Sequence, residues 1–350
     1  MTADELTSGE DLKVDSASIE QTLAELWRTE KQEHDNAVTR AALWNVVAHT
    51  ATPEHHTDAS EVLGKASIAV PQRTIVVRAN PEAATEMTSW ISANCHLLGE
   101  GKQVCSEEIS IIAGGDRVAR VPPLVSALLI PDMPVAVWWV GDLPHENADY
   151  VHALLEPADR LIVDSSAFDN PADLEIVARV AQRTLTAPAD LNWIRLEEWR
   201  IATASLFDPP QMRSKLAHVR GIRIISDSMQ QNYFGERIEG LLFSSWILTQ
   251  AGCEMDRVDI AIEERQSLRR GLLRVEVTME DASVALIERD LERGVLMTRY
   301  DGHVIVPEGV TRAHKRTTDQ LIVRELKDPS SDRLLLKVLP VSVELAKRIA

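Results

Sequence analysis

Two adjacent tryptophans end the segment that most constrains the fold of this chain. Residues 135–140 are apolar without interruption, with Pro134 before them and Gly141 after them. Such a run between turn-forming residues predicts a short strand buried on both faces, as in a parallel or mixed sheet covered by helices. Because side chains alternate along a strand, Trp138 and Trp139 are expected to point to opposite faces. One indole then belongs to the core, and the other lies under a covering element or at a surface where a partner docks.

The segments before residue 190 predict alternating helices and strands, which is typical of βαβ units. The expected helices are 18–31, 53–65, 120–130, 148–155 and 171–185, and the expected strands are 74–78, 135–140 and 160–164. Residues 90–96 and 104–112 are expected to pair as an antiparallel hairpin. The first half is therefore predicted to be an α/β domain with a mixed sheet.

The pattern changes after residue 190. Helices are expected at 190–207 and 236–251, followed by strands at 257–264, 271–279, 282–289 and 294–300. Polar and apolar residues alternate in the second of these strands, which indicates an antiparallel sheet with one wet face. The predicted fold class is α/β, with an N-terminal α/β half followed by an α+β half. The predicted domains are a disordered leader (1–17), an α/β domain (18–189), an α+β domain (190–310) and a charged C-terminal segment (311–350).

The charge balance bears on the class of partner. Acidic residues number 54 and basic residues 37, which gives a net charge of −17. Nucleic acids and anionic membranes bind positive surfaces, so neither is expected as a partner, although negative charge is also an ordinary means of staying soluble. The polar, acidic N-terminus does not resemble a secretory signal, and no segment has the roughly 20 apolar residues of a membrane span. Three cysteines fit a reducing compartment, so the expected location is cytoplasmic.

The sequence offers little support for a metal, cofactor or nucleophile site. His55 and His56 are adjacent rather than at metal-ligand spacing, and are expected to face solvent on a polar helix. The glycines at 99–101 and 114–115 are isolated and are interpreted as turns rather than phosphate loops. No catalytic residue, cofactor or metal is therefore predicted.

One alternative is a ligand site at Asp164-Ser165-Ser166, which follows a buried strand. Sheets of this class commonly bind ligands beyond the carboxyl ends of their strands. This favours an enzyme or sensor that binds a sugar phosphate there. The competing interpretation is that one serine caps the segment leading into the next helix.

Cys95 and Cys105 lie symmetrically about Glu100 in the predicted hairpin. Directly opposed strand residues have Cβ atoms about 4.5–5.5 Å apart, which is close to disulfide reach. The two cysteines are therefore either a reversible redox pair or two small buried thiols.

Tryptophan is over-represented among the aromatic residues, with eight Trp against four Phe and three Tyr. Besides Trp138 and Trp139, two tryptophans fall in the predicted helix 190–207. Trp and Arg are enriched at protein–protein hot spots, so this helix is a candidate docking surface. The competing interpretation is a set of core tryptophans flanked by salt-bridged arginines. The candidate partner-binding residues are Trp138, Trp139, Asp142, Trp193, Arg195, Trp199 and Arg200.

At these residues the sequence resembles the glucose-6-phosphate dehydrogenase assembly proteins called OpcA. The stretches that carry the resemblance are Cys95-His96, Gln103 to Ile109, Pro122 to Asp132, Pro134 to Trp139, Leu161 to Ser165, and Asp190 to Leu196 continuing through Trp199-Arg200 to Phe207-Asp208. Their order and spacing agree as a set. One departure is Val140, because a basic residue often follows the tryptophan pair in this family.

The resemblance implies a non-catalytic partner protein. Members of the family bind glucose-6-phosphate dehydrogenase, favour its assembled active state and raise its activity. A protein that binds the active conformation more tightly shifts the population toward that conformation. We therefore expect an assembly factor and activator of glucose-6-phosphate dehydrogenase in the oxidative pentose phosphate pathway, in preference to the sugar-phosphate-binding alternative.

Overall fold

The computed structural model describes residues 7–8, 12–33, 38–98, 102–143, 148–170, 172–228, 234–267, 270–328 and 330–349. The chain forms two compact units: Met1–Val163 with Leu185–Ala187 and Thr317–Ser330, and Asp164–Thr184 with Pro188–Arg316 and Ser331–Ala350. The predicted boundary at residue 190, between an α/β and an α+β domain, stays a prediction. The turn predicted at 99–101 and most of the predicted leader lie outside the described residues.

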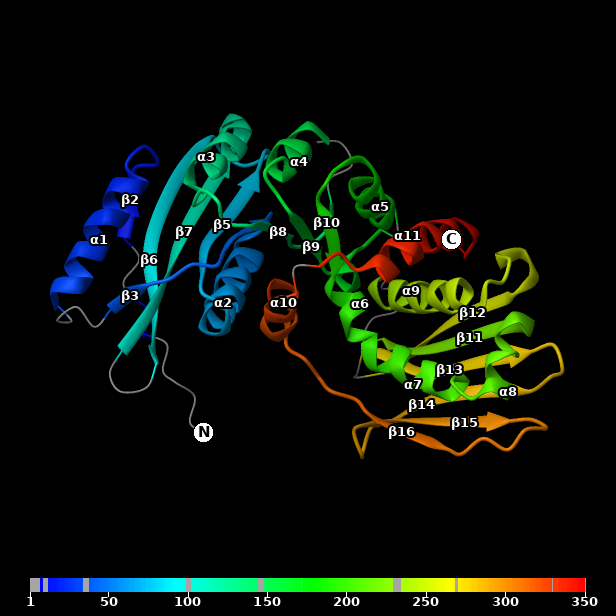
Figure 1. Cartoon of the computed structure of the whole chain (residues 1–350). Helices are drawn as coiled ribbons and strands as arrows, with labels where there is room; N and C mark the ends of the chain where they lie inside the picture. Colours follow the sequence, from blue (N-terminus) through cyan, green and yellow to red (C-terminus); the bar gives the residue numbers. More distant parts are fainter. Residues whose placement is uncertain are drawn as a thin grey trace. The chain divides into compact units, whose positions relative to one another are not determined.

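The first sheet is mixed, as predicted (Figure 1). Its main path runs β1-β6-β7-β5-β4-β8-β9-β10, with β2 paired to β6 and β3 paired to β7. The strands are β1 (Thr7–Ser8), β2 (Leu12–Val14), β3 (Val38–Arg40), β4 (Trp44–Thr50), β5 (Gln72–Asn80), β6 (Glu86–Leu98), β7 (Lys102–Gly114), β8 (Val135–Trp139), β9 (Arg160–Val163) and β10 (Ala187–Asp190).

The central strands β7, β5, β4, β8 and β9 are parallel to one another. The chain places β5 on one side of β4 and later returns to place β8 on its other side. This reversal makes the gap between the carboxyl ends of β4 and β8 a topological switch point, the usual ligand position in open α/β sheets. The strand predicted from the tryptophan pair is β8, and all five of its residues are buried.

The helices of the first unit are α1 (Ile19–Glu33), α2 (Pro53–Ala69), α3 (Val121–Leu128), α4 (Ala148–Leu155) and α10 (Thr318–Lys327). Helix α2 begins where the Thr52 side chain accepts a hydrogen bond from the His55 amide at 3.2 Å, with Pro53 in the first turn. Helix α10 begins at a capping box formed by Thr317 and Gln320. The Trp44 indole donates to the Leu326 carbonyl at 3.0 Å and so ties α10 to β4.

The second sheet has the order β12-β11-β13-β14-β15-β16. Its strands are β11 (Val219–Ser228), β12 (Asp259–Gln266), β13 (Gly271–Met279), β14 (Val284–Asp290), β15 (Val295–Asp301) and β16 (Gly309–Arg312). The predicted antiparallel sheet is confirmed for every pair except β11 and β12, which are parallel. Strand β11 was not predicted, yet it lies between β12 and β13.

The helices of the second unit are α5 (Asp173–Arg183), α6 (Leu191–Arg195), α7 (Glu197–Phe207), α8 (Pro210–Arg213), α9 (Phe234–Ala251) and α11 (Arg333–Ile349). Helix α9 packs closely on β12, since a Cβ at Gly240 would lie 2.9 Å from Ile262 Cγ2. The single helix predicted at 190–207 is wrong, because the chain turns at Leu196 between α6 and α7. The C-terminal segment predicted only as charged contains α10 and α11, both with buried residues.

Candidate functional site

The switch point of the first sheet is filled by three aromatic side chains. His49 of β4 and Trp139 of β8 are register partners, and their rings stack with centroids 3.8 Å apart and planes 19° apart. Tyr150 of α4 meets both rings edge-on, at 5.5 and 6.4 Å. The Trp139 indole donates to the Asp142 carbonyl at 2.9 Å. Buried aromatic side chains of the chain itself therefore lie at the position where open α/β sheets usually bind ligands.

This cluster is electrically neutral near pH 7. Burial lowers the pKa of His49 to about 3 and raises the pKa of Tyr150 above its ordinary value. Burial, with the charge of Arg78, also lowers the pKa of His56 to about 4. The His56 ring lies 2.7 Å from the Ser110 hydroxyl of β7, so the expectation that it faces solvent is wrong. Near pH 7 the rings of His49 and His56 are therefore uncharged, and the positive charge beside His56 is that of Arg78.

The tryptophan pair does not present a free indole. Trp138 is 5% exposed and Trp139 2% exposed, so both side chains belong to the core on opposite faces of β8. The hypothesis that one of them docks a partner directly is therefore not supported. Asp142, the third candidate residue in this segment, is exposed.

The tryptophans of α6 and α7 are also core residues. Trp193 donates through its indole to Asp332 at 2.7 Å, and Trp199 meets Phe243 of α9 edge-on at 6.3 Å. The guanidinium of Arg200 lies 3.6 Å from the centre of the Trp193 ring and donates to the Trp193 carbonyl at 2.6 Å. This region agrees with the competing interpretation, in which the tryptophans are core residues and the arginines beside them bond within the chain. Partner contact through the exposed parts of Arg195 and Arg200 stays a prediction.

The Asp164-Ser165-Ser166 segment is joined to α6 by an internal polar network. Arg195 makes a two-pronged ion pair with Asp164, with both N–O distances at 2.7 Å, and the Ser166 hydroxyl donates to Asp164 at 2.6 Å. The Ser165 hydroxyl donates to Asp190 at 2.6 Å, and both residues are buried. Asp164 also caps the following turn through the Ser166 amide. These groups bond to one another, which weakens the case for a sugar-phosphate site. The cap is Asp164, so the interpretation that one of the serines caps the segment is wrong.

The two aspartates of this network titrate in opposite directions. Burial raises the pKa of Asp190 to about 6, aided by the nearby charge of Asp164 and opposed by the hydrogen bonds from Ser165. Burial alone would also raise the pKa of Asp164, but its bonds to Arg195 lower it instead. The ion pair with Arg195 therefore keeps Asp164 ionised. As the pH falls, Asp190 takes up a proton before Asp164 does.

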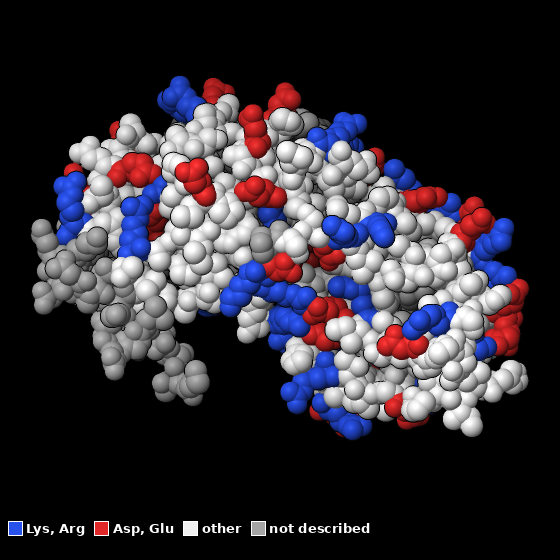
Figure 2. Space-filling view, in the orientation of Figure 1, with Lys and Arg blue, Asp and Glu red and all other residues white. Residues whose placement is uncertain are grey.

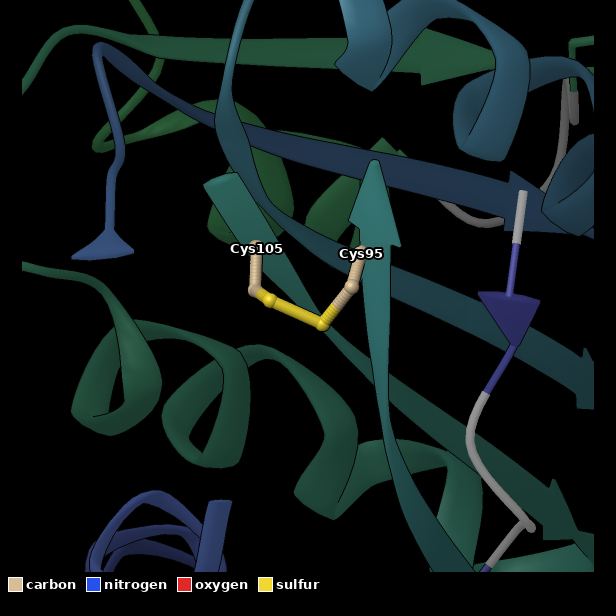
Figure 3. The surroundings of a disulfide bond; sticks show 2 residues. All are labelled: Cys95 and Cys105. Carbon is tan, nitrogen blue, oxygen red and sulfur yellow. A yellow bond between two sulfur atoms is a disulfide. The ribbon is translucent and has the colours of Figure 1, made fainter. Parts of the chain in front are cut away.

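Cys95 and Cys105 form a disulfide between β6 and β7 (Figure 3). They are direct register partners, as the predicted hairpin requires. Cys95 is 7% exposed and Cys105 fully buried. The interpretation as two buried thiols is therefore wrong on pairing, and the role of the pair as a redox switch stays a prediction.

Two other features are absent from the ranges that the structure describes. In this part of the chain there is no group of three or more His, Cys, Asp or Glu side chains placed to hold a metal ion. Nor does any helix within it combine the length and apolar character needed to cross a membrane.

Two family models match the chain in sequence order. Residues 64–179 match the glucose-6-phosphate dehydrogenase subunit N-terminal domain of OpcA, and residues 186–339 match the corresponding C-terminal domain. The chain belongs to the OpcA family. The resemblance carried by the tryptophan and cysteine motifs is thereby confirmed over most of the sequence.

Two cyanobacterial relatives, each described as a putative OxPP cycle protein OpcA, match about half of the chain. The protein of Synechocystis sp. is 31% identical over 183 residues, which are 51% of this chain and 37% of that protein. The protein of Synechococcus elongatus is 27% identical over 186 residues, or 52% of this chain and 40% of its own length. The matched region thus spans well under two thirds of either relative.

Some solved structures show a weaker likeness. An NAD-binding oxidoreductase from Klebsiella pneumoniae is 12% identical, with a TM-score of 0.44 over 88% of this chain and 96% of that chain. A putative oxidoreductase from Magnetospirillum magnetotacticum is 13% identical, with a TM-score of 0.45 over 86% of this chain and 99% of that chain. Scores at this level establish no shared activity.

The sequence reasoning missed two members of the aromatic cluster, His49 and Tyr150. A signal for His49 was present, since it is a single polar ring near the end of an apolar strand. Tyr150 carried no comparable signal. It reaches the cluster only because α4 follows β8 and packs back over its end.

Proposed function

We propose that this chain is a non-catalytic subunit that binds glucose-6-phosphate dehydrogenase and favours its active oligomer. The observation that carries the proposal is the ordered match of both OpcA domain models across residues 64–339. Binding the active oligomer more tightly than the inactive state would shift the enzyme toward activity by that difference in affinity. Such a role places the chain in the oxidative pentose phosphate pathway and in the cytoplasm.

The filled switch point supports a role without catalysis. The stacked rings of His49 and Trp139 lie near the carboxyl ends of β4 and β8, at the switch point where sheets of this kind usually bind ligands. The serine and aspartate groups near Asp164 are engaged with one another in the buried network. These side chains therefore give no support for a catalytic role. The function proposed is regulation of a separate enzyme.

The exposed parts of Asp142, Arg195 and Arg200 are the proposed partner contacts among the candidate residues. Trp138, Trp139, Trp193 and Trp199 would act indirectly, by holding β8, α6 and α7 in place. Polar and Arg side chains at an interface often set the association rate and specificity. Substitution of one of these half-buried arginines should thus weaken binding, and a measurement of folding must accompany it.

The test is co-elution of the purified chain with glucose-6-phosphate dehydrogenase from the same organism. Wild type should form a complex, and Arg200→Ala should weaken it by about tenfold, the effect of roughly 1.4 kcal/mol. Arg179→Ala, an exposed arginine of α5 in the same unit, is the matched control and should bind as wild type does. Circular dichroism must show that both variants are folded. Equal affinities of all three proteins would remove Arg200 from the interface, and absence of any complex would refute the proposal.

A further inference from the structure

The Cys95–Cys105 disulfide lies beneath the N-terminal helix of the first unit. Trp27 of α1, 5% exposed, forms one buried cluster with Ala93 and the two cysteines, and Leu26 packs against this cluster. Figure 3 shows the two cysteines bridging neighbouring strands of the hairpin. A reductant can reach the sulfur atoms from this side only after α1 has moved.

Polar contacts hold α1 and β3 to the same carboxylate, that of Glu107. The Trp27 indole donates to Glu107 at 2.9 Å, and Arg40 of β3 donates to the same carboxylate at 2.8 Å. The Arg40 guanidinium also lies 5.7 Å from the centre of the Trp27 ring. Glu107 is buried two residues beyond Cys105, so the disulfide and the anchor of α1 share one strand.

A buried ion pair extends this anchor. Arg73, 3% exposed, pairs with Glu107 and with Glu20 in the first turn of α1. Burial alone would raise the pKa of Glu107, but Arg73, Arg40 and the Trp27 indole lower it, so the carboxylate stays charged. Strand β3 adds backbone pairing in which Arg40 is the register partner of Cys105. Helix α1 and strand β3 are thus both attached to the sheet around the disulfide.

We propose that Cys95–Cys105 is a thiol–disulfide exchange site whose access is gated by α1. A dithiol attacks one sulfur, the Cys95–Cys105 bond breaks, and the resulting mixed disulfide is resolved by the second thiol of the reductant. Two electrons and two protons pass to the cysteines, which become two thiols, while the dithiol becomes a disulfide. Exchange requires direct access of a thiolate to sulfur, so docking of α1 protects the bond.

Reduction of the disulfide should in turn weaken the docking of α1. Two unbonded sulfur atoms need more room than two bonded ones, and the added volume falls against Trp27 in a packed core. Reduction should therefore favour the undocked state of α1, by the same factor by which undocking favours reduction. This inference concerns the chain alone and does not depend on the proposed partner.

The first test measures the rate of reduction by dithiothreitol under native conditions, with alkylation and mass spectrometry to count free thiols. Trp27→Ala should accelerate reduction by about tenfold or more, because it raises the population in which α1 is open. Trp90→Ala is the matched control: it lies on the same strand as Cys95, on the opposite face, next to Lys13. Leu26→Ala, a milder change in the same cluster, should give a smaller acceleration and serves if Trp27→Ala does not fold.

The second test measures the reciprocal effect by limited trypsin cleavage at Arg28, an exposed residue of α1. The reduced protein and the Cys95→Ser/Cys105→Ser double variant should both be cleaved faster than the oxidised protein. Equal rates of reduction in wild type and in both α1 variants, or equal rates of cleavage in both redox states, would overturn the proposal. Two alkylatable thiols at Cys95 and Cys105 in protein purified under oxidising conditions would overturn it as well.

Discussion

The two sheets of this chain use their faces in opposite ways. Central strands of the first sheet bury both faces, and two of them end in the stacked rings of His49 and Trp139. The second sheet buries one face, which includes Ile224 and Val275, and covers the other with charged side chains. Figure 2 shows basic and acidic side chains interspersed over much of the visible surface of the second unit.

The charged face of the second sheet is organised as a row of ion pairs across adjacent strands. Arg223 of β11 pairs with Glu263 of β12 at 2.8 Å and with Glu276 of β13 at 3.7 Å, and Arg274 of β13 pairs with Glu288 of β14 at 3.8 Å. Exposed pairs of this kind contribute little to stability, whereas packed aromatic cores contribute much. We therefore expect substitutions in the packed core of the first sheet to change stability much more than substitutions on the charged face of the second sheet.

The largest effect is expected in the first sheet. Trp139→Ala would remove a buried indole and leave a cavity beside His49, at an expected cost of about 3–5 kcal/mol in the free energy of unfolding. Chemical denaturation followed by circular dichroism measures this cost. Trp139→Phe, which keeps a ring against His49, should lose clearly less. A loss below about 1 kcal/mol for Trp139→Ala would show that the stack is not a core element.

An intermediate effect on stability is expected at Asp190, because its carboxyl group is buried. The folded pKa of about 6 is above the unfolded value, so the stabilising contribution of this group is present at low pH. That contribution is lost as the pH rises through about 6, with a total of roughly 2–3 kcal/mol between pH 4 and pH 7. Asp190→Asn keeps an oxygen acceptor for the amides of Ser165 and Asn192 but cannot ionise.

Unfolding measured at several pH values tests the assignment to Asp190. The stability of wild type relative to Asp190→Asn should decrease as the pH rises from 4 to 7. Parallel pH profiles for the two proteins would contradict the raised pKa of Asp190.

The smallest effect is expected on the charged face of the second sheet. Arg223→Ala should change the unfolding midpoint far less than the Trp139 and Asp190 substitutions, because its guanidinium and its partner Glu263 are both about half exposed. The remaining difference from wild type should shrink as salt is added, since salt screens exposed charges. A loss as large as that of Trp139→Ala, or one insensitive to salt, would remove the contrast between the two sheets.

Much of the fold could be predicted because its signals are local. The apolar run ending in Trp138-Trp139 predicted β8, and the spacing of Cys95 and Cys105 about their turn predicted the hairpin register. Strand β11 was missed because Gly221 and Arg223 interrupt its apolar pattern, although it is central in its sheet. Helix α11 was missed although its sequence is amphipathic, because Pro340 interrupts it.

The candidate site was predicted less well, because its geometry depends on residues distant in sequence. Trp193 is buried partly through its bond to Asp332, and no pattern near Trp193 indicates that partner. Likewise, Trp27 meets the disulfide and Glu107 only after α1 packs on the hairpin. Residue type marked Trp193 as a candidate, but only tertiary packing shows that Trp193 and Trp27 face inward.

The central claim is that this chain binds glucose-6-phosphate dehydrogenase and favours its active oligomer. The most direct measurement is a titration of the chain into the enzyme from the same organism, at limiting glucose 6-phosphate, with oligomer mass and initial rate recorded on the same samples. The account predicts that a larger complex containing both proteins and a higher rate appear together and saturate at one fixed ratio. An unchanged mass distribution and an unchanged rate at every ratio, with the disulfide either oxidised or reduced, would contradict it.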